Sequence, residues 1–329
     1  MELIPCPISG DRDFTPLLEA PDRFALSGPK WKLVRSSSSG LVMLNPRPDA
    51  SESSKHYPEH SYDPFLHSGN CNNPRDRAYL SISSLLLGLK ARIVMNGLCK
   101  PAESVRILET GCSSGRLLMR LHKGFGIPLD NLCGIEPDQQ AAAAAKAAGL
   151  TRITSTELAK TSFETRFDRI VFWHVFEHLH HIEETLDKTR DLLEKEGMLV
   201  IALPNIDSED AKRYGSRWIA LDAPRHLYHF TPKTLTLLLE KHGFSVIDVT
   251  PYVPDAIYNV WHSEKLDCTL SGRSFSIRSA ARAAACTVSS VMAGIDPGRS
   301  SGIVCRAVRS SQDLRSGGTT RPSDFSSSA

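Results

Sequence analysis

The sequence predicts an α/β protein with a doubly wound sheet, and three apolar runs carry that prediction. The first, Val105–Leu108, ends in an acidic residue and a loop with two glycines, and a helix-forming segment follows. The second is Leu132–Ile135 and the third is Phe167–Trp173, and polar residues follow both. Near-continuous apolar runs are typical of buried parallel strands. Because ligands bind at the carboxyl ends of such strands, we expect the site at that edge of the sheet.

Length and composition limit the possible classes of protein. A chain of 329 residues can hold one full α/β domain with smaller additions. The net charge of +2 predicts no strong attraction to nucleic acid or to a membrane surface. None of the eight cysteines forms a Cys-x-x-Cys pair, which favours free thiols in a reducing compartment and predicts a cytoplasmic location.

Neither a leader nor a membrane span is expected. Met1–Pro7 is too short an apolar run for a secretory signal. The most apolar segment, Leu80–Cys99, is interrupted by Lys90 and Arg92. It therefore predicts a packed helix, roughly Pro74–Leu98, rather than a stable insertion in a membrane.

The first glycine loop reads Glu-Thr-Gly-Cys-Ser-Ser-Gly from Glu109 to Gly115. A glycine adopts strained dihedral angles and lets a ligand approach the backbone. The helix that follows directs its free N–H groups at the loop, where they can bind an anion. The glycine spacing differs from that of the dinucleotide fingerprint, and no Gly-Lys-Ser/Thr follows. The loop therefore indicates another type of nucleotide-like cofactor.

The second apolar run ends at Glu136, about 20 residues beyond the glycine loop, which is the separation expected for a carboxylate on ribose hydroxyls. A solvated turn carboxylate is the alternative. Asp138 is expected to cap an alanine-rich helix that ends at Gly149.

The remaining elements follow from periodicity and from glycine and proline positions. A helix is expected over Ile182–Glu196, ended by Gly197. The other expected strands are Ile153–Thr156, Met198–Leu203, Phe244–Val249 and Gly302–Val308, with helices between Asp255 and Ala293 and a disordered tail over 309–329.

Two groups of histidines are candidates for metal binding or for a catalytic role. The run His174-Val-Phe-Glu177-His178 follows the third apolar run and could place metal ligands on adjacent helical faces. We favour hydrogen-bonded polar residues there and predict no metal. His226 and His229 lie in a later ring-rich segment, where they could bind or deprotonate an acceptor or simply fix the loop to the sheet.

Together, Glu-x-Gly-x-x-x-Gly, Glu136 and the phrase Trp-His-Val-Phe-Glu-His resemble class I S-adenosylmethionine (SAM) dependent methyltransferases over about Ser104–Val249. Many members carry a third glycine where Ser113 stands. The resemblance implies a Rossmann-like, doubly wound, seven-stranded sheet that binds SAM. The implied cofactor-binding residues are Glu109, Gly111, Cys112, Ser113, Gly115, Glu136, Pro137, Glu157, Leu158, Trp173 and His174. The candidate catalytic residues are His174, His178 and His226.

The N-terminal segment, 1–70, resembles a small zinc ribbon that precedes this domain in some relatives. Its four ligand positions hold Cys6, Ser9, Ser36 and Ser39, and serine is a poor zinc ligand. We therefore predict a ribbon-like segment without metal, an ordinary β-hairpin being the alternative. The methyltransferase domain is expected over 71–308.

The predicted function is methyl transfer from SAM to a small-molecule acceptor, favouring a hydroxyl oxygen because relatives act on sugars, quinones and phenols. No Asn-Pro-Pro-Tyr motif follows the expected strand Phe167–Trp173, which argues against nucleic acid as a partner. The alternatives are a SAM-binding scaffold without catalysis and a different Rossmann-type nucleotide binder. The oligomeric state is not predicted.

Overall fold

The computed structural model describes residues 1–57 and 74–310, with the side chains of the second range described from residue 83 onward. The expected boundary near residue 70 and the predicted tail beyond residue 310 lie outside the described residues.

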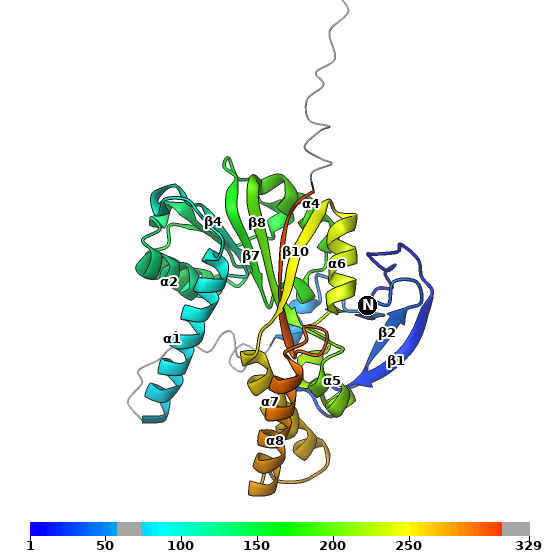
Figure 1. The fold of residues 1–329 in the computed structure, drawn as a ribbon. Coiled ribbons are helices and arrows are strands. Elements are labelled where there is room, and N and C mark those ends of the chain that lie inside the picture. The colour runs from blue at the N-terminus through cyan, green and yellow to red at the C-terminus, as the bar shows by residue number, and fades with distance from the viewer. Residues whose placement is uncertain (58–73, 311–329) are drawn as a thin grey trace, which may run out of the picture.

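A seven-stranded sheet forms the centre of the molecule, in the order β10-β11-β8-β7-β4-β5-β6 (Figure 1). The strands are β4 (Ile107–Thr110), β5 (Leu132–Ile135), β6 (Arg152–Thr154), β7 (Phe167–Trp173), β8 (Leu193–Pro204), β10 (Phe244–Pro251) and β11 (Gly302–Arg309). Strands β4 to β8 pair in parallel, whereas β11 runs antiparallel to both β8 and β10. The predicted doubly wound, seven-stranded sheet is confirmed.

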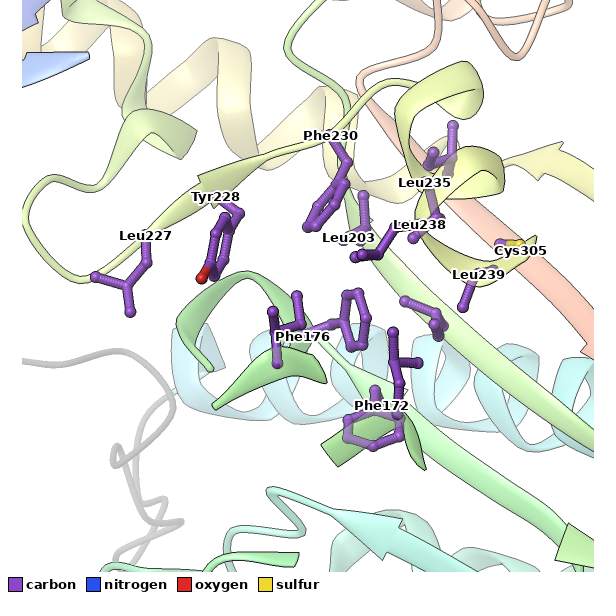
Figure 2. Close-up of a cluster of buried hydrophobic side chains, with 14 of the residues drawn as sticks. Phe172, Phe176, Leu203, Leu227, Tyr228, Phe230, Leu235, Leu238, Leu239 and Cys305 are labelled. Atoms are coloured by element: carbon purple, nitrogen blue, oxygen red, sulfur yellow. The ribbon is translucent and has the colours of Figure 1, made fainter. Parts of the chain in front are cut away.

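Alternate residues of the strands point to opposite faces of the sheet, and apolar residues on both faces pack against helices. On β7, Phe172 belongs to the core under α4 and α6, and Val171 and Trp173 belong to the core under α1, α2 and α3. Figure 2 shows Phe172 and Phe176 beside leucines of α6. The helices are α1 (Pro74–Met95), α2 (Arg116–Phe125), α3 (Gln139–Ala147), α4 (Ile182–Leu192) and α6 (Pro232–Lys241).

The boundary between α4 and β8 differs from the prediction. The helix was expected to continue to Glu196, but it ends at Leu192, and β8 begins at Leu193. Leu193 pairs with Phe167 of β7 and is fully buried. Pairing with a neighbouring strand therefore overrides the helical pattern of this segment.

The N-terminal segment forms an antiparallel sheet, β1 (Phe14–Ala20), β2 (Trp31–Ser36) and β3 (Val42–Leu44). Its fourth strand, β9 (Tyr228–His229), comes from the segment between β8 and α6. The N-terminal segment is thus joined by backbone pairing to the part of the chain that carries the later histidines.

The segment after β10 forms a helical pair, α7 (Pro254–Leu270) and α8 (Ile277–Ala293), and a shorter helix, α5 (Glu209–Tyr214), packs against both. Figure 1 shows this pair projecting below the sheet, with the start of α7 close to the end of β10 and the beginning of β11. A short 3₁₀ turn, Phe176–His178, follows β7. Among the described residues, no helix is long and apolar enough to cross a membrane.

Candidate functional site

The glycine loop joins β4 to α2 in a left-handed conformation, with φ values of +70° at Gly111, +48° at Ser113 and +72° at Gly115. The N–H of Gly111 donates to the carbonyl of Ile135 at 2.7 Å, which ties the loop to the end of β5. A Cβ on Gly111 would lie 2.3 Å from Cγ2 of Val175. This glycine therefore makes room for a side chain of the protein itself.

Glu136 is fixed at the end of β5, where the sequence predicts a ribose-binding carboxylate. One carboxylate oxygen accepts from the N–H of Ser113 at 2.8 Å, and the other accepts from the N–H of Asp138 at 2.9 Å. The residue is only 7% exposed, and burial raises its pKa against the effect of these backbone bonds. Because each carboxylate oxygen can accept more than one hydrogen bond, both retain capacity for a ligand.

A second carboxylate, Glu109, lies at the end of β4. Burial raises its pKa to about 8, and the nearby charge of Lys90 acts in the opposite direction. Among the described residues, its Oε2 atom has no hydrogen-bond partner. Lys90 comes from α1, and its ammonium lies 4.9 Å from the ring centre of Trp173. The site thus combines a buried carboxyl group, the half-buried amine of Lys90 and the indole ring of Trp173.

The other predicted cofactor residues differ in their surroundings. Cys112 is buried, and a Cβ on Gly134 would lie 2.5 Å from its sulfur. Pro137 is exposed. After β6, Leu158 is buried in the core, whereas Glu157 pairs with Lys160 at the surface at 3.2 Å. No described contact joins Glu157 or Leu158 to Glu136, so their adenine-binding role stays a prediction.

His174 follows β7 and lies between two carboxylates. Its backbone is left-handed (φ +54°), its Nε2 lies 3.3 Å from Oδ1 of Asp255, and its Nδ1 lies 3.6 Å from Oε1 of Glu177. Burial alone would lower the pKa of His174, but the two carboxylates outweigh it and raise the pKa to about 9. The imidazolium is therefore the main form at neutral pH.

Glu177, His178 and His226 come together although His226 is distant in sequence. One ligand atom from each lies within 4.8 Å of the others. The Nδ1 atom of His226 lies 2.8 Å from the carbonyl of Ala220, and that of His178 lies 3.0 Å from the carbonyl of Arg225. Carbonyls only accept, so Nδ1 carries a hydrogen in both rings and Nε2 is the ring nitrogen left for another contact.

Burial sets the protonation of this cluster. It would raise the pKa of Glu177, but the surrounding imidazoles, His174 first, lower that pKa to about 2. Burial lowers the pKa of His226 to about 4 and that of His229 to about 3, and neighbouring imidazoles add to both effects. At neutral pH an ionised Glu177 carboxylate thus lies between the His174 imidazolium and the neutral ring of His226.

Lys90 and Asp255 were missed as site residues. The sequence shows Lys90 only as an interruption of an apolar helix, which is a weak signal for an amine whose pKa is lowered by burial. Asp255 lies in the first turn of α7, 81 residues after His174, and no motif marks it.

The four ribbon positions also converge. The sulfur of Cys6 lies 3.2 Å from the hydroxyl of Ser39, and the hydroxyls of Ser9 and Ser36 are 3.4 Å apart. The turns therefore bring the four positions together. The expectation of a segment without metal stays a prediction.

The fold is that of a doubly wound α/β protein, with a glycine loop and a buried carboxylate at the carboxyl ends of two adjacent parallel strands. Residues 76–249, more than half of the chain, match the family model described as a methyltransferase domain. The chain belongs to this family. The prediction of a class I SAM-dependent methyltransferase is confirmed at the level of family and fold. A search of curated protein sequences finds no significant match.

Solved structures with similar folds are distant in sequence. Geranyl diphosphate C-methyltransferase from Streptomyces coelicolor A3(2), in complex with Mg²⁺, geranyl diphosphate and S-adenosyl-L-homocysteine, is 11% identical with a TM-score of 0.51 over 80% of this chain and 100% of that chain. Phosphoethanolamine N-methyltransferase 2 from Haemonchus contortus, in complex with SAM, is 15% identical with a TM-score of 0.46. That match covers 68% of this chain and 52% of the relative, so the chain spans about half the length of that enzyme.

Proposed function

We propose that this protein binds SAM and transfers its methyl group to a hydroxyl oxygen of a small molecule. The observation that carries the proposal is the position of Glu136. Its carboxylate is anchored by backbone N–H groups next to the glycine loop, on a strand adjacent to β4. This arrangement suits an adenosyl group whose vicinal hydroxyls both donate to one carboxylate.

The other end of SAM carries an ammonium and a carboxylate. We assign the ammonium to Glu109, whose buried Oε2 lacks a described partner, and the carboxylate to Lys90. Trp173 would form the wall beside the methionine chain. The sulfonium then lies between the glycine loop and His174, at the ends of β4 and β7.

Methyl transfer from SAM mainly requires that the protein orients the acceptor oxygen toward the methyl group. The acceptor oxygen attacks the methyl carbon, the O–CH₃ bond forms as the S–CH₃ bond breaks, and the hydroxyl proton leaves. Holding the oxygen in line with that bond can supply about 7–11 kcal/mol of the barrier. A positioned base can add about 10²–10⁴-fold in rate.

The candidate bases differ in protonation. His174 is mainly imidazolium at neutral pH and is therefore suited to hold negative charge on the acceptor or on Glu177. In His178 and His226 the Nδ1 atom is bonded to a main-chain carbonyl, which leaves Nε2 as the atom that could accept the hydroxyl proton. We therefore propose these two as the acceptor-side residues. The cytoplasmic location, the absence of a nucleic-acid partner and the choice of oxygen over nitrogen or carbon stay predictions.

The test is thermal unfolding of the full chain with SAM, S-adenosylhomocysteine and NAD, since a bound ligand raises the melting temperature. We expect the first two to raise it, and Glu136→Ala to remove most of that rise. Glu103→Ala, which alters an exposed carboxylate before β4, is the matched control and should keep it. A larger rise with NAD than with SAM would contradict the proposal. A panel of phenols and sugars, read by mass spectrometry for one added methyl group, then identifies the acceptor class.

A further inference from the structure

We propose that Glu177, His178 and His226 bind one divalent transition-metal ion beside His174. The three residues come from two segments, the 3₁₀ turn after β7 and the loop before β9, and the N–H of Leu227 donates to the carbonyl of Glu177 between them. Their ligand atoms lie within 4.8 Å of one another.

The Glu177 carboxylate is buried without a described hydrogen bond. Its side chain is 2% exposed, and among the described residues neither oxygen has a hydrogen-bond partner. The nearest cationic or imidazole atoms that approach it are His174 Nδ1 at 3.6 Å and His226 Nε2 at 4.0 Å, both beyond normal hydrogen-bond length. The nearby imidazoles stabilise the charge of this buried carboxylate, and a bound cation would supply the direct contacts that its two oxygens lack.

Main-chain carbonyls fix the orientation of the His178 and His226 imidazoles. The Nδ1–H groups of His178 and His226 are held by the main-chain carbonyls of Arg225 and Ala220. A metal-binding histidine commonly donates its other ring N–H to a carbonyl or carboxylate, which fixes the tautomer and the ring direction. Both rings therefore already have the second contact that metal ligation requires, and each leaves Nε2 as the possible ligand.

The donor set indicates the class of ion. Two imidazole nitrogens and one carboxylate suit Zn²⁺, Co²⁺, Fe²⁺ or Mn²⁺, whereas Mg²⁺ and Ca²⁺ prefer sites built from oxygen. With bonds of about 2.0–2.2 Å, ligand atoms of a tetrahedral zinc ion are about 3.3 Å apart. The three ligand atoms lie within 4.8 Å of one another, and Glu177 Oε1 and His226 Nε2 are 4.0 Å apart, so side-chain rotation would have to bring them closer around the ion.

The neighbouring acidic residue does not compete for this role. Oδ2 of Asp222 lies 3.9 Å from His226 Nε2, but this carboxylate is already paired with Arg225 and Arg23. Three protein ligands leave an open position at the ion, as in catalytic zinc sites.

This inference deepens the proposed function and rests on it for its role: the open position would take the acceptor oxygen. The ion would then lower the pKa of the acceptor hydroxyl, the proton would pass to solvent, and the oxygen would be free to attack the methyl group. His178 and His226 would act as ligands instead of bases. Metal binding itself can be measured without SAM or acceptor.

The experiment measures bound metal in the full chain. The protein is stripped with a chelator, dialysed against Zn²⁺, Co²⁺ or Mg²⁺, and analysed by elemental emission, with visible absorption recorded for Co²⁺. We expect about one Zn²⁺ or Co²⁺ per chain, a Co²⁺ ligand-field band, and no retained Mg²⁺. Glu177→Gln and His226→Asn should each weaken Zn²⁺ binding by at least about 100-fold.

His181→Asn is the matched control, because His181 is an exposed histidine near the start of α4 and should not alter the metal content. Circular dichroism checks that each variant folds, and His178→Asn replaces any variant that does not. The inference is wrong if the wild-type chain retains no ion, or if the ion remains equally tightly bound in folded ligand variants. Parallel titration with SAM separates the outcomes, because SAM binding without metal rejects only this inference and metal without SAM binding rejects the proposed function.

Discussion

The N–H of Ser113 donates to the carboxylate of Glu136 at 2.8 Å, and this bond connects the loop after β4 with the end of β5. It shows how two motifs that are separate in the sequence form one surface. The cofactor proposal depends on this surface, and the predictions below test its parts.

Ser113 occupies a backbone conformation that suits glycine, with φ at +48°. A left-handed conformation costs a residue with a Cβ about 1–2 kcal/mol, whereas glycine in the unfolded chain costs about 0.5–1 kcal/mol in entropy. Ser113→Gly should therefore leave the free energy of unfolding unchanged or raise it by about 1 kcal/mol. Urea unfolding measures this, and Ser113→Val should lower stability instead. A clear loss of stability in Ser113→Gly would contradict the left-handed assignment.

Gly111 is limited by both its backbone and its neighbour. Gly111→Ala should lose about 2–4 kcal/mol, because strain at φ +70° adds to the overlap with Val175. Gly126→Ala is the control, since Gly126 has φ +73° but open space where a Cβ would lie, and should cost only about 1–2 kcal/mol. Adding Val175→Ala to Gly111→Ala should restore the share of the stability loss that comes from overlap with Val175. Equal losses in both alanine variants would show that Val175 does not occupy that space.

Glu109 gives a pH dependence with a defined sign. Its pKa is about 8 in the folded protein against 4.5 as the ordinary value, so between these pH values the folded state holds a proton that the unfolded state has lost. Its contribution to stability is thus fully present below pH 4.5 and is lost as pH rises through 8. Urea unfolding from pH 5 to 8 should show wild type losing more stability than Glu109→Gln. Parallel curves would mean that the pKa of Glu109 is not raised.

Arg225 tests the attachment of the N-terminal segment. Its guanidinium is fully buried and pairs with Asp22 at 2.8 Å and with Asp222 at 2.9 Å. Arg225→Met should cost about 3–5 kcal/mol because it leaves buried carboxylates without their partner. Arg299→Met breaks an exposed pair with Glu209 and should cost less than about 1 kcal/mol. Similar small losses in both variants would argue against the Arg225 pairs as the attachment of the N-terminal segment.

Much of the sheet could be predicted because its strands are short apolar runs with polar ends. The runs that became β4, β5 and β7 needed only local pattern, and so did the helix cap at Asp138, which accepts from the N–H of Ala141 at 2.7 Å. The end of α4 could not be predicted, because Leu193 joins β8 through pairing with Phe167.

The acceptor side of the site could be predicted only in part. His174, Glu177 and His178 stand in one motif, but Asp255 and His226 reach them from distant segments. From the motif alone, hydrogen-bonded polar residues were the favoured interpretation of Glu177. In the structure neither carboxylate oxygen has a described hydrogen bond and His226 lies nearby, and the metal site proposed above starts from these two observations.

The most direct test of the central claim is a crystal structure of the full chain with S-adenosylhomocysteine. The account predicts that both ribose hydroxyls lie within hydrogen-bond distance of Glu136, and that the amino acid end lies between Glu109 and Lys90. A ligand bound elsewhere, or Glu136 turned into solvent with the ribose free, would contradict it.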